Sequence, residues 1–335
     1  MYWNYVKLAI GIGIIEAIGC TAAIIVGSAY WPWILLTCTI LFLIFFLILA
    51  FAYVRILDGD WENNLDLSRV KMEIVDIPIA DGFSILGRVL KEPGLDNKPY
   101  PLVIVHHGLS GYGRKLLWLA VPLAMRGYIV LLPDARAHGD SAKRNRKARM
   151  DDWYITETTG IIPDFHRIVD YACSRPDVDT ARIAAIGHSL GGATVLTAGL
   201  LDTRVKLVIP MSAFYSFVDL VEAKRSRKPL SEEWFSKNFL RFYINPGKLK
   251  KVNEQISPKF YFYKLSRDDA REKVRLIHAK DDKLVLFEAS AEKIIADLQL
   301  PDNHVFLTEK GDHPLRCQET MILVKILDWL TEAGI

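Results

Sequence analysis

A serine between glycines is the feature of this sequence that most directly indicates chemistry. Residues Gly187–Gly191 read Gly-His-Ser-Leu-Gly, with Ser189 at the centre. Where a strand turns at once into a helix, a serine at the corner is strained and its hydroxyl is exposed, and side chains two residues away on either side would collide. The run Arg182–Gly187 is typical of a strand and Leu190–Leu201 of a helix, so the spacing predicts that Ser189 is a nucleophile.

A serine hydroxyl needs a general base, which is itself oriented by an acid. In chains with a serine at such a corner, the acid follows the serine in the sequence and the histidine follows the acid. The histidines after Ser189 are His278, His304 and His313. His278 and His304 fall within predicted strands, where a core or edge position explains them. We therefore predict His313, in a loop after the last strand, as the base; Asp312 beside it is either a supporting group or exposed.

The acid is expected in the loop after the predicted strand Arg275–Ala279, where Asp281 and Asp282 are adjacent. Either lies on a suitable loop. The spacing from His278 through Asp282 to Val285 favours Asp282, and Asp281 is then interpreted as a solvated neighbour. Ser189, Asp282 and His313 form the predicted triad.

Two backbone N–H groups should stabilise the oxyanion that forms when the serine attacks a carbonyl. One is predicted to be that of Leu190, at the start of the helix. The other is expected in the loop after the strand Leu102–His106, and we assign it to Leu109. His106 and His107 are interpreted as shaping this loop.

Strands and helical segments alternate beyond Asp58, which predicts a mostly parallel sheet with helices on both faces. The first two strands, with a turn between them, are expected to form an antiparallel pair. The predicted strands are Glu73–Ile79, Phe83–Leu90, Leu102–His106, Tyr128–Leu132, Arg182–Gly187, Val205–Met211, Arg275–Ala279 and His304–Leu307. The predicted helices are Lys115–Arg126, Glu157–Cys173, Leu190–Leu201, Glu288–Leu298 and Glu319–Thr331. The stretch 213–272, rich in aromatic and basic residues, has no clear strand and is interpreted as a helical cap over the site.

Further motifs extend the pattern around the serine. His107-Gly108 has the form of an oxyanion loop, and residues 134–141 read Asp-Ala-Arg-Ala-His-Gly-Asp-Ser. Together with the block from Arg175 to Gly192, they resemble the bacterial α/β hydrolases of the dienelactone-hydrolase, acyl-esterase and prolyl-oligopeptidase-like group. The resemblance runs from about Glu73 to the end of the chain. Ala137 stands where that group usually has glycine.

The resemblance implies the α/β-hydrolase fold and places Asp282 and His313 on the group's remaining triad positions. It leaves the substrate open, because the group cleaves carboxylic esters, thioesters, lactones and peptides. We expect a carboxylesterase or lipase-like enzyme acting on small-molecule or lipid acyl esters. A prolyl-oligopeptidase-like peptidase ranks lower because no β-propeller precedes the domain. A non-catalytic membrane scaffold ranks last, since it would not need all three triad residues.

A long apolar stretch precedes the predicted hydrolase domain. Residues 17–53 contain no Asp, Glu, Lys or Arg. Together with the apolar residues just before it, this stretch is long enough for two membrane-spanning helices, with a break at Pro32. We predict transmembrane helices at about Val6–Val26 and Trp33–Val54, within a segment 1–57 followed by a hydrolase domain 58–335. A cleaved signal peptide is the weaker alternative, because the second apolar stretch would remain.

The few positive charges lie on the flanks of this stretch, at Lys7 on one side and Arg55, Arg69 and Lys71 on the other. The positive-inside rule then predicts a multi-pass membrane protein with a cytoplasmic hydrolase domain. A net charge of +3 and the lack of a basic stripe argue against nucleic acid as a partner. The four cysteines have no metal-ligand spacing, so neither a metal nor another cofactor is expected. The sequence does not define an oligomeric state.

Overall fold

The computed structural model describes residues 37, 39–45, 66–95, 98–109, 111–144, 158–226 and 254–335. The chain divides into two compact units, residues 1–64 and 65–335. In the first unit the described residues are helical, and the side chains from Ile40 to Ile44 are exposed. The rest of the two predicted membrane helices lies outside the described residues. Within the described part of the chain, no helix combines the length and apolar character that crossing a membrane requires.

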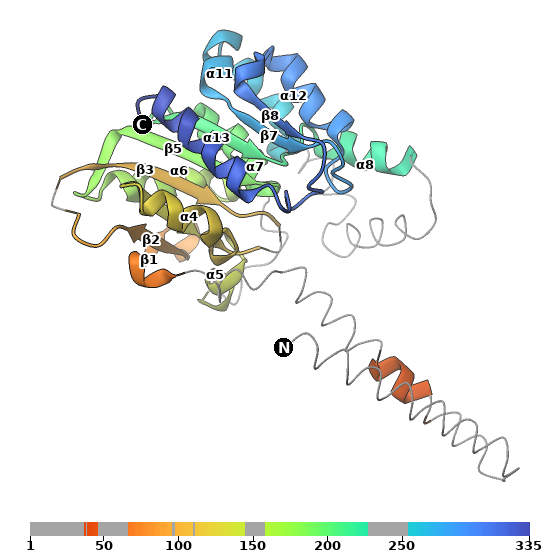
Figure 1. Cartoon of the computed structure of the whole chain (residues 1–335), viewed down its shortest axis with the longest axis horizontal. Coiled ribbons are helices and arrows are strands. Elements are labelled where there is room, and N and C mark those ends of the chain that lie inside the picture. Colours follow the sequence, from red (N-terminus) through yellow and green to blue (C-terminus); the bar gives the residue numbers. More distant parts are fainter. Residues whose placement is uncertain are drawn as a thin grey trace, which may run out of the picture. The chain divides into compact units, whose positions relative to one another are not determined.

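An eight-stranded sheet forms the centre of the second unit (Figure 1). Its strand order is β1-β2-β4-β3-β5-β6-β7-β8. The first two pairings, β1 with β2 and β2 with β4, are antiparallel, and every later pairing is parallel. The predicted mostly parallel sheet and its antiparallel first pair are thus confirmed. The strands are β1 Lys71–Pro78, β2 Ser84–Lys91, β3 Tyr100–His106, β4 Ile129–Pro133, β5 Val178–His188, β6 Val205–Met211, β7 Leu276–Ala279 and β8 Val305–Thr308.

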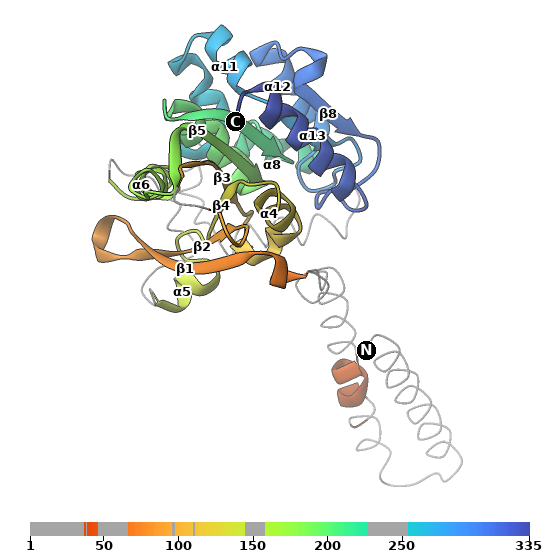
Figure 2. The same ribbon diagram turned by 60° about the vertical axis from the view of Figure 1, so that its left-hand side comes forward.

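Helices cover both faces of the sheet, as the alternation of strands and helices predicted. Along β3, Leu102 and Ile104 pack into one core with residues of α6 (Ile161–Cys173), because successive side chains of a strand point to opposite faces. Val103 and Val105 pack into a second core with α4 (Leu117–Ala124) and α13 (Glu319–Glu332). Figure 2 shows α6 on one side of the sheet and α4 and α13 on the other.

Most predicted helices begin later than their sequence patterns suggest. The helix expected from Glu157 begins at Ile161, after Gly160, whose φ of 108° is not helical. The helix expected from Glu288 begins at Ala291, because Phe287–Ala289 form a separate 3-10 turn. The helix after the serine is α7 (Leu190–Thr194), which continues as a π-helical turn, Val195–Gly199.

Within the predicted cap, 213–272, the described elements are helices and 3-10 turns joined by short loops, and residues 227–253 lie outside the described part. It contains α8 (Phe217–Ser226), the 3-10 turns Pro258–Phe260 and Phe262–Lys264, and the beginning of α11 (Arg267–Lys273). Phe217 and Leu220 of α8 are buried in the same core as α6. The first helix of the predicted cap is therefore part of the core of the second unit.

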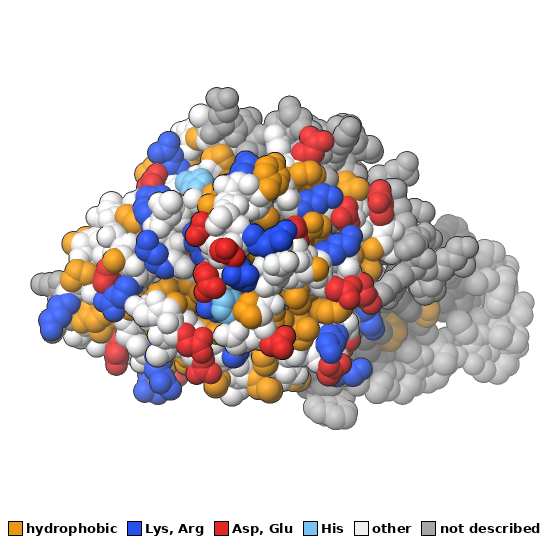
Figure 3. Space-filling model, turned by 90° about the horizontal axis from the view of Figure 1, so that it is seen from above, with side chains coloured by type: hydrophobic (Ala, Val, Ile, Leu, Met, Phe, Trp, Pro, Cys, Tyr) orange, Lys and Arg blue, Asp and Glu red, His pale blue; other side chains and the backbone are white. Residues whose placement is uncertain are grey.

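The described surface mixes charges of both signs. On the face shown in Figure 3, basic and acidic side chains are interspersed among apolar ones. Among the described residues, several charged side chains form ion pairs: Arg175 binds Asp177 and Glu73, and Arg204 binds Asp170 and Asp202.

Candidate active site

Ser189 lies at the corner between β5 and α7. Its φ of 56° and ψ of −115° place an L-residue in a sparsely populated region of backbone space. The corner is held by its neighbours, since the Ser189 N–H donates to the Met211 carbonyl at 2.8 Å and the Ala193 N–H donates to the Ser189 carbonyl at 3.0 Å. The predicted junction of strand, serine and helix is therefore present.

The two motif glycines leave no room for side chains. A Cβ atom on Gly187 would lie 2.1 Å from the Gly191 carbonyl oxygen, and one on Gly191 would lie 2.2 Å from the His106 carbonyl oxygen. Both obstacles are backbone atoms, which cannot turn aside as a flexible side chain could. The collision predicted at these positions is confirmed.

We therefore expect Gly187→Ala to destabilise the protein by about 3 kcal/mol, as overpacking of a rigid core does. Gly199→Ala is a matched control, because its Cβ would meet nothing nearer than 3.5 Å and its φ is not positive. That variant should be neutral or gain up to about 1 kcal/mol from the better helix propensity of alanine. Denaturant unfolding of both variants measures the difference, and equal stabilities would refute the steric argument.

Asp282 and His313 meet beyond the carboxyl ends of β7 and β8. The Nδ1–H of His313 donates to Oδ2 of Asp282 at 2.9 Å. The other carboxylate oxygen accepts the N–H groups of Leu284 and Val285, each at 2.8 Å. Burial by itself would raise the pKa of Asp282, but the hydrogen bond from His313 and its nearby charge outweigh burial, and the pKa lies below the ordinary value. The carboxylate therefore stays ionised and orients the imidazole.

The contacts of His278 give a structural reason for the spacing from His278 through Asp282 to Val285, which favoured Asp282 as the acid. Its ring is fully buried in β7, and its Nε2–H donates to the Val285 carbonyl at 2.9 Å. The same residue, Val285, donates its N–H to Asp282. His278 thus supports the loop that carries the carboxylate. His304 differs from its prediction, because it ends a 3-10 turn, Asp302–His304, instead of lying within β8.

Asp281 is more than the solvated neighbour that we predicted. One of its carboxylate oxygens accepts the N–H of Asp312 at 2.7 Å, and Asp312 in turn accepts the N–H of Lys283 at 3.2 Å. The two aspartates therefore tie the loop of the acid to the loop of the base. This link is needed because Asp312 has a φ of 53°, which a non-glycine residue rarely adopts.

Contacts next to Ser189 bring the base loop against the serine corner. His188, the last residue of β5, donates its Nε2–H to the His313 carbonyl at 2.9 Å. The hydroxyl of Ser212, just after β6, donates to the same carbonyl at 3.1 Å. Neither role was predicted, although His188 lies inside the glycine-flanked motif, because a motif does not show which distant carbonyl a side chain reaches.

The loop after β3 lies beside the serine. A Cβ atom on Gly108 would be 3.0 Å from the Ser189 Cβ. The Gly108 carbonyl accepts two hydrogen bonds, from His107 Nδ1–H at 2.7 Å and from the Gly111 N–H at 3.0 Å. In a trans peptide the N–H of the next residue points opposite to the carbonyl, so the N–H of Leu109 faces away from His107. Leu190, the other predicted donor, is the first residue of α7, where a helical N–H has no intrahelical partner.

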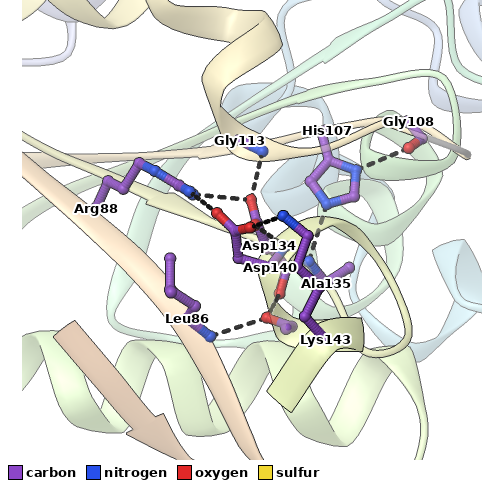
Figure 4. A network of polar contacts seen from close by, with 10 residues as sticks. Leu86, Arg88, His107, Gly108, Gly113, Asp134, Ala135, Asp140 and Lys143 are labelled. Carbon is purple, nitrogen blue, oxygen red and sulfur yellow. Dashed lines mark hydrogen bonds and ion pairs between the residues drawn. The ribbon is translucent and has the colours of Figure 1, made fainter. Parts of the chain in front are cut away.

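His107 is itself held in one tautomer (Figure 4). Its Nε2 accepts the Ala135 N–H at 2.8 Å, so the proton must reside on Nδ1, which donates to Gly108. Burial, followed by the neighbouring His106 and His138, keeps the pKa of His107 well below its usual value. The ring is therefore neutral, and His107 links the loop after β3 to the backbone at Ala135.

Asp134 anchors the turn that presents Ala135. This fully buried carboxylate accepts the N–H of Gly113 at 2.7 Å and that of Asp140 at 2.8 Å, and it pairs with Arg88 at 3.1 Å. Figure 4 shows the chain of contacts from Arg88 on β2 through Asp134 to the loop after β3. The charge is thus neutralised and hydrogen-bonded, as burial requires.

The turn also contains Ala137, at the position where the resembling group usually has glycine. Its φ of 59° lies in the left-handed region, which costs alanine about 1 kcal/mol relative to glycine. Arg136 holds the turn in place through two hydrogen bonds, 2.7 and 2.8 Å long, to Asp164 on α6. The alanine strains the turn but leaves its hydrogen bonds intact.

Among the described residues there is no cluster of His, Cys, Asp or Glu side chains suited to a metal ion. The arrangement offers instead a strained serine, an aspartate–histidine pair and backbone donors. These are the groups that acyl transfer uses.

Comparisons with known proteins support the fold. A family described as "alpha/beta hydrolase fold" matches residues 101–251. Over 139 residues the chain is 25% identical to cutinase est2 of Thermobifida alba, a match that covers 41% of this chain and 41% of that protein. The matched stretch is thus less than half of the relative's length.

Solved structures share the fold at low sequence identity. An acetyl xylan esterase from Paenibacillus sp. R4 superposes with a TM-score of 0.54 and 24% identity, covering 79% of this chain and 86% of that one. A puromycin-hydrolyzing peptidase from Mycobacterium tuberculosis gives a TM-score of 0.61 and 19% identity, covering 78% and 39%. The chain has the α/β-hydrolase fold, with an esterase and a peptidase among its structural neighbours.

Proposed function

We propose that this protein is a serine hydrolase that cleaves carboxylic esters through Ser189, His313 and Asp282. The observation that carries the proposal is the 2.9 Å hydrogen bond from His313 Nδ1–H to the buried carboxylate of Asp282. Such a pair fixes the tautomer in which Nε2 is free to accept a proton. It lies beside the strand end that holds the strained serine.

In the proposed reaction, Ser189 Oγ attacks the ester carbonyl carbon while its proton passes to Nε2 of His313. The carbonyl π electrons move to the oxygen, whose negative charge the N–H groups of Leu109 and Leu190 stabilise. Collapse of this intermediate breaks the bond to the alcohol, which leaves with the proton held by His313. Water then attacks the acyl-enzyme in the same way, and the acid and Ser189 are released.

We favour esters over peptides because the curated relative is named a cutinase and a neighbour over most of this chain is an acetyl xylan esterase. The peptidase neighbour keeps peptide hydrolysis as the second candidate. The membrane anchoring predicted for residues 1–57 stays a prediction. The exposed apolar side chains from Ile40 to Ile44 are compatible with it, and they are one reason to include lipid-derived acyl esters in the proposed substrate class.

A substrate panel tests the ester proposal. We expect p-nitrophenyl acetate, butyrate, octanoate and palmitate to be hydrolysed with kcat/KM at least about 100-fold above that of alanyl and glycyl-prolyl p-nitroanilides. An ester's alcohol leaves far more readily than an amine, so an esterase need not protonate its leaving group as strongly. Efficient cleavage of the anilides with weak cleavage of every ester would replace the proposal by the peptidase alternative.

A further inference from the structure

The loop that carries His313 is poorly suited to hold a residue still by itself. Between residues 311 and 317, Gly311, Asp312, Leu315 and Cys317 all have positive φ values. Non-glycine residues in this region are strained and persist only when surrounding contacts determine them. The position of the His313 ring therefore depends on the groups that bind this loop from outside.

His188 supplies the contact nearest to the reacting groups. Its Nε2–H donates to the His313 carbonyl at 2.9 Å, and the two rings lie 4.9 Å apart between centroids at a tilt of 48°. On its other side, the ring and carbonyl of His188 lie against Gly108: a Cβ there would be 3.4 Å from His188 Nδ1 and 3.2 Å from the His188 oxygen. One side chain thus touches the base loop and the loop after β3, directly before Ser189.

The carbonyl of His313 receives a second donor from the adjacent strand end. Ser212, which follows β6, donates its hydroxyl at 3.1 Å. The Ser212 N–H donates to Ile277 of β7 at 2.9 Å, so the hydroxyl is fixed by the sheet. His188 and Ser212 therefore hold one carbonyl from the ends of two neighbouring parallel strands, while Asp282 holds the ring of the same residue.

The charge state of His188 suits a donor of this kind. Burial, then the charge of His313, lowers the pKa of His188 to about 4. The charges of His313 and His278 lower the pKa of His188, whereas the hydrogen bond to the His313 carbonyl and the charge of Asp282 raise it. At neutral pH the ring is uncharged and carries its proton on Nε2, so it does not oppose an imidazolium on His313.

We propose that His188 is a positioning residue that acts through His313, holding its carbonyl so that the imidazole is aligned between Asp282 and Ser189. The inference rests on the proposed function, because it concerns the base of that reaction. The proposal gives His188, the residue directly before Ser189, a positioning role in addition to its packing.

Two variants that differ by one methylene test the inference. His188→Gln carries an amide N–H the same number of bonds from Cβ as Nε2 of histidine, whereas the amide of His188→Asn is one bond too short. We expect His188→Asn to lower kcat about 10- to 100-fold with little change in KM, because small displacements of a catalytic group cost up to about 100-fold. His188→Gln should retain most of the activity. Thermal unfolding of both variants confirms that each is folded.

A double-variant comparison separates positioning from general structural damage. If His188 acts through His313, adding His188→Asn to His313→Ala should lower the residual rate by less than about twofold. A further loss equal to that of the single variant would overturn the inference, as would full kcat in a folded His188→Asn. If the histidine variants fail to fold, Ser212→Ala gives the same readout on the same carbonyl, and additivity with His313→Ala would overturn the inference.

These outcomes are distinct from a failure of the proposed function. In that case the wild-type protein would hydrolyse no ester and would not react with a fluorophosphonate. If the wild type reacts and the His188 variants are unaffected, the esterase proposal stands and only the positioning role is lost.

Discussion

Ser189→Ala is expected to abolish labelling by a fluorophosphonate probe and to lower ester hydrolysis about 10⁶-fold. Removing the nucleophile of a serine triad has an effect of this size, since only binding and oxyanion stabilisation remain. Alanine keeps the Cβ of serine and loses only the hydroxyl, so the φ of 56° at this corner strains the variant no more than the wild type, and the variant should fold. Gel fluorescence after labelling, together with initial rates on p-nitrophenyl butyrate, measures the effect.

Ser174→Ala is the matched control. Ser174 caps the end of α6, where its exposed hydroxyl donates to the Tyr171 carbonyl; it precedes β5, whereas Ser189 follows the other end of that strand. This variant should label and turn over as the wild type does. If folded wild-type protein does not label at all, the catalytic proposal is wrong and the non-catalytic alternative gains support. If Ser189→Ala labels as strongly as Ser174→Ala, another residue is the nucleophile.

His313→Ala is expected to lower kcat by about 10⁴- to 10⁶-fold, with nearly unchanged stability. The magnitude follows from losing the group that takes the serine proton. The His313 ring is partly exposed and its loop is held by backbone contacts, so the fold should tolerate its removal. Rates on a saturating ester, beside thermal unfolding, separate the two effects.

His278→Ala provides the opposite pattern. Its fully buried ring fills space beside Asp282 and donates to Val285, so its loss leaves a cavity and an unpaired carbonyl. We expect a loss of stability of about 3 kcal/mol and a kcat within about tenfold of wild type. Equal losses of activity in two folded variants would show that His313 is wrongly assigned as the base.

The sheet was predictable because its central strands are buried on both faces. Such strands read as short continuous apolar runs, as in Leu102–Val105 and Leu207–Met211, and they can be recognised without knowledge of their neighbours. The order of the strands in the sheet was not predictable, because nothing in the sequence of β4 shows that it lies between β2 and β3. Helix starts failed for a related reason: Gly160 and the 3-10 turn before α12 depend on backbone angles that apolar spacing does not report.

In the candidate site, the pairing of Asp282 with His313 was predictable from chain order and from the type of loop that carries each residue. What escaped prediction were the contacts made by backbone atoms. Asp281 was set aside as solvated because its partner is the amide of Asp312, 31 positions away along the chain. His188 was passed over for the same reason, since its partner is a carbonyl. A one-letter sequence says nothing about which peptide groups end up facing a side chain.

Because His313 lies near the end of the chain, it is synthesised later than the serine corner. The serine corner is assembled from β5 and α7, whereas the base arrives with the loop after β8, the strand that is added at the edge of the sheet. During synthesis, the first of these segments leaves the ribosome well before the second. A nascent chain can therefore shape its nucleophile while it still lacks the group that activates it. In the proposed reaction, Ser189 would attack esters only after the last strand has docked, and unfinished copies of the protein would be inactive.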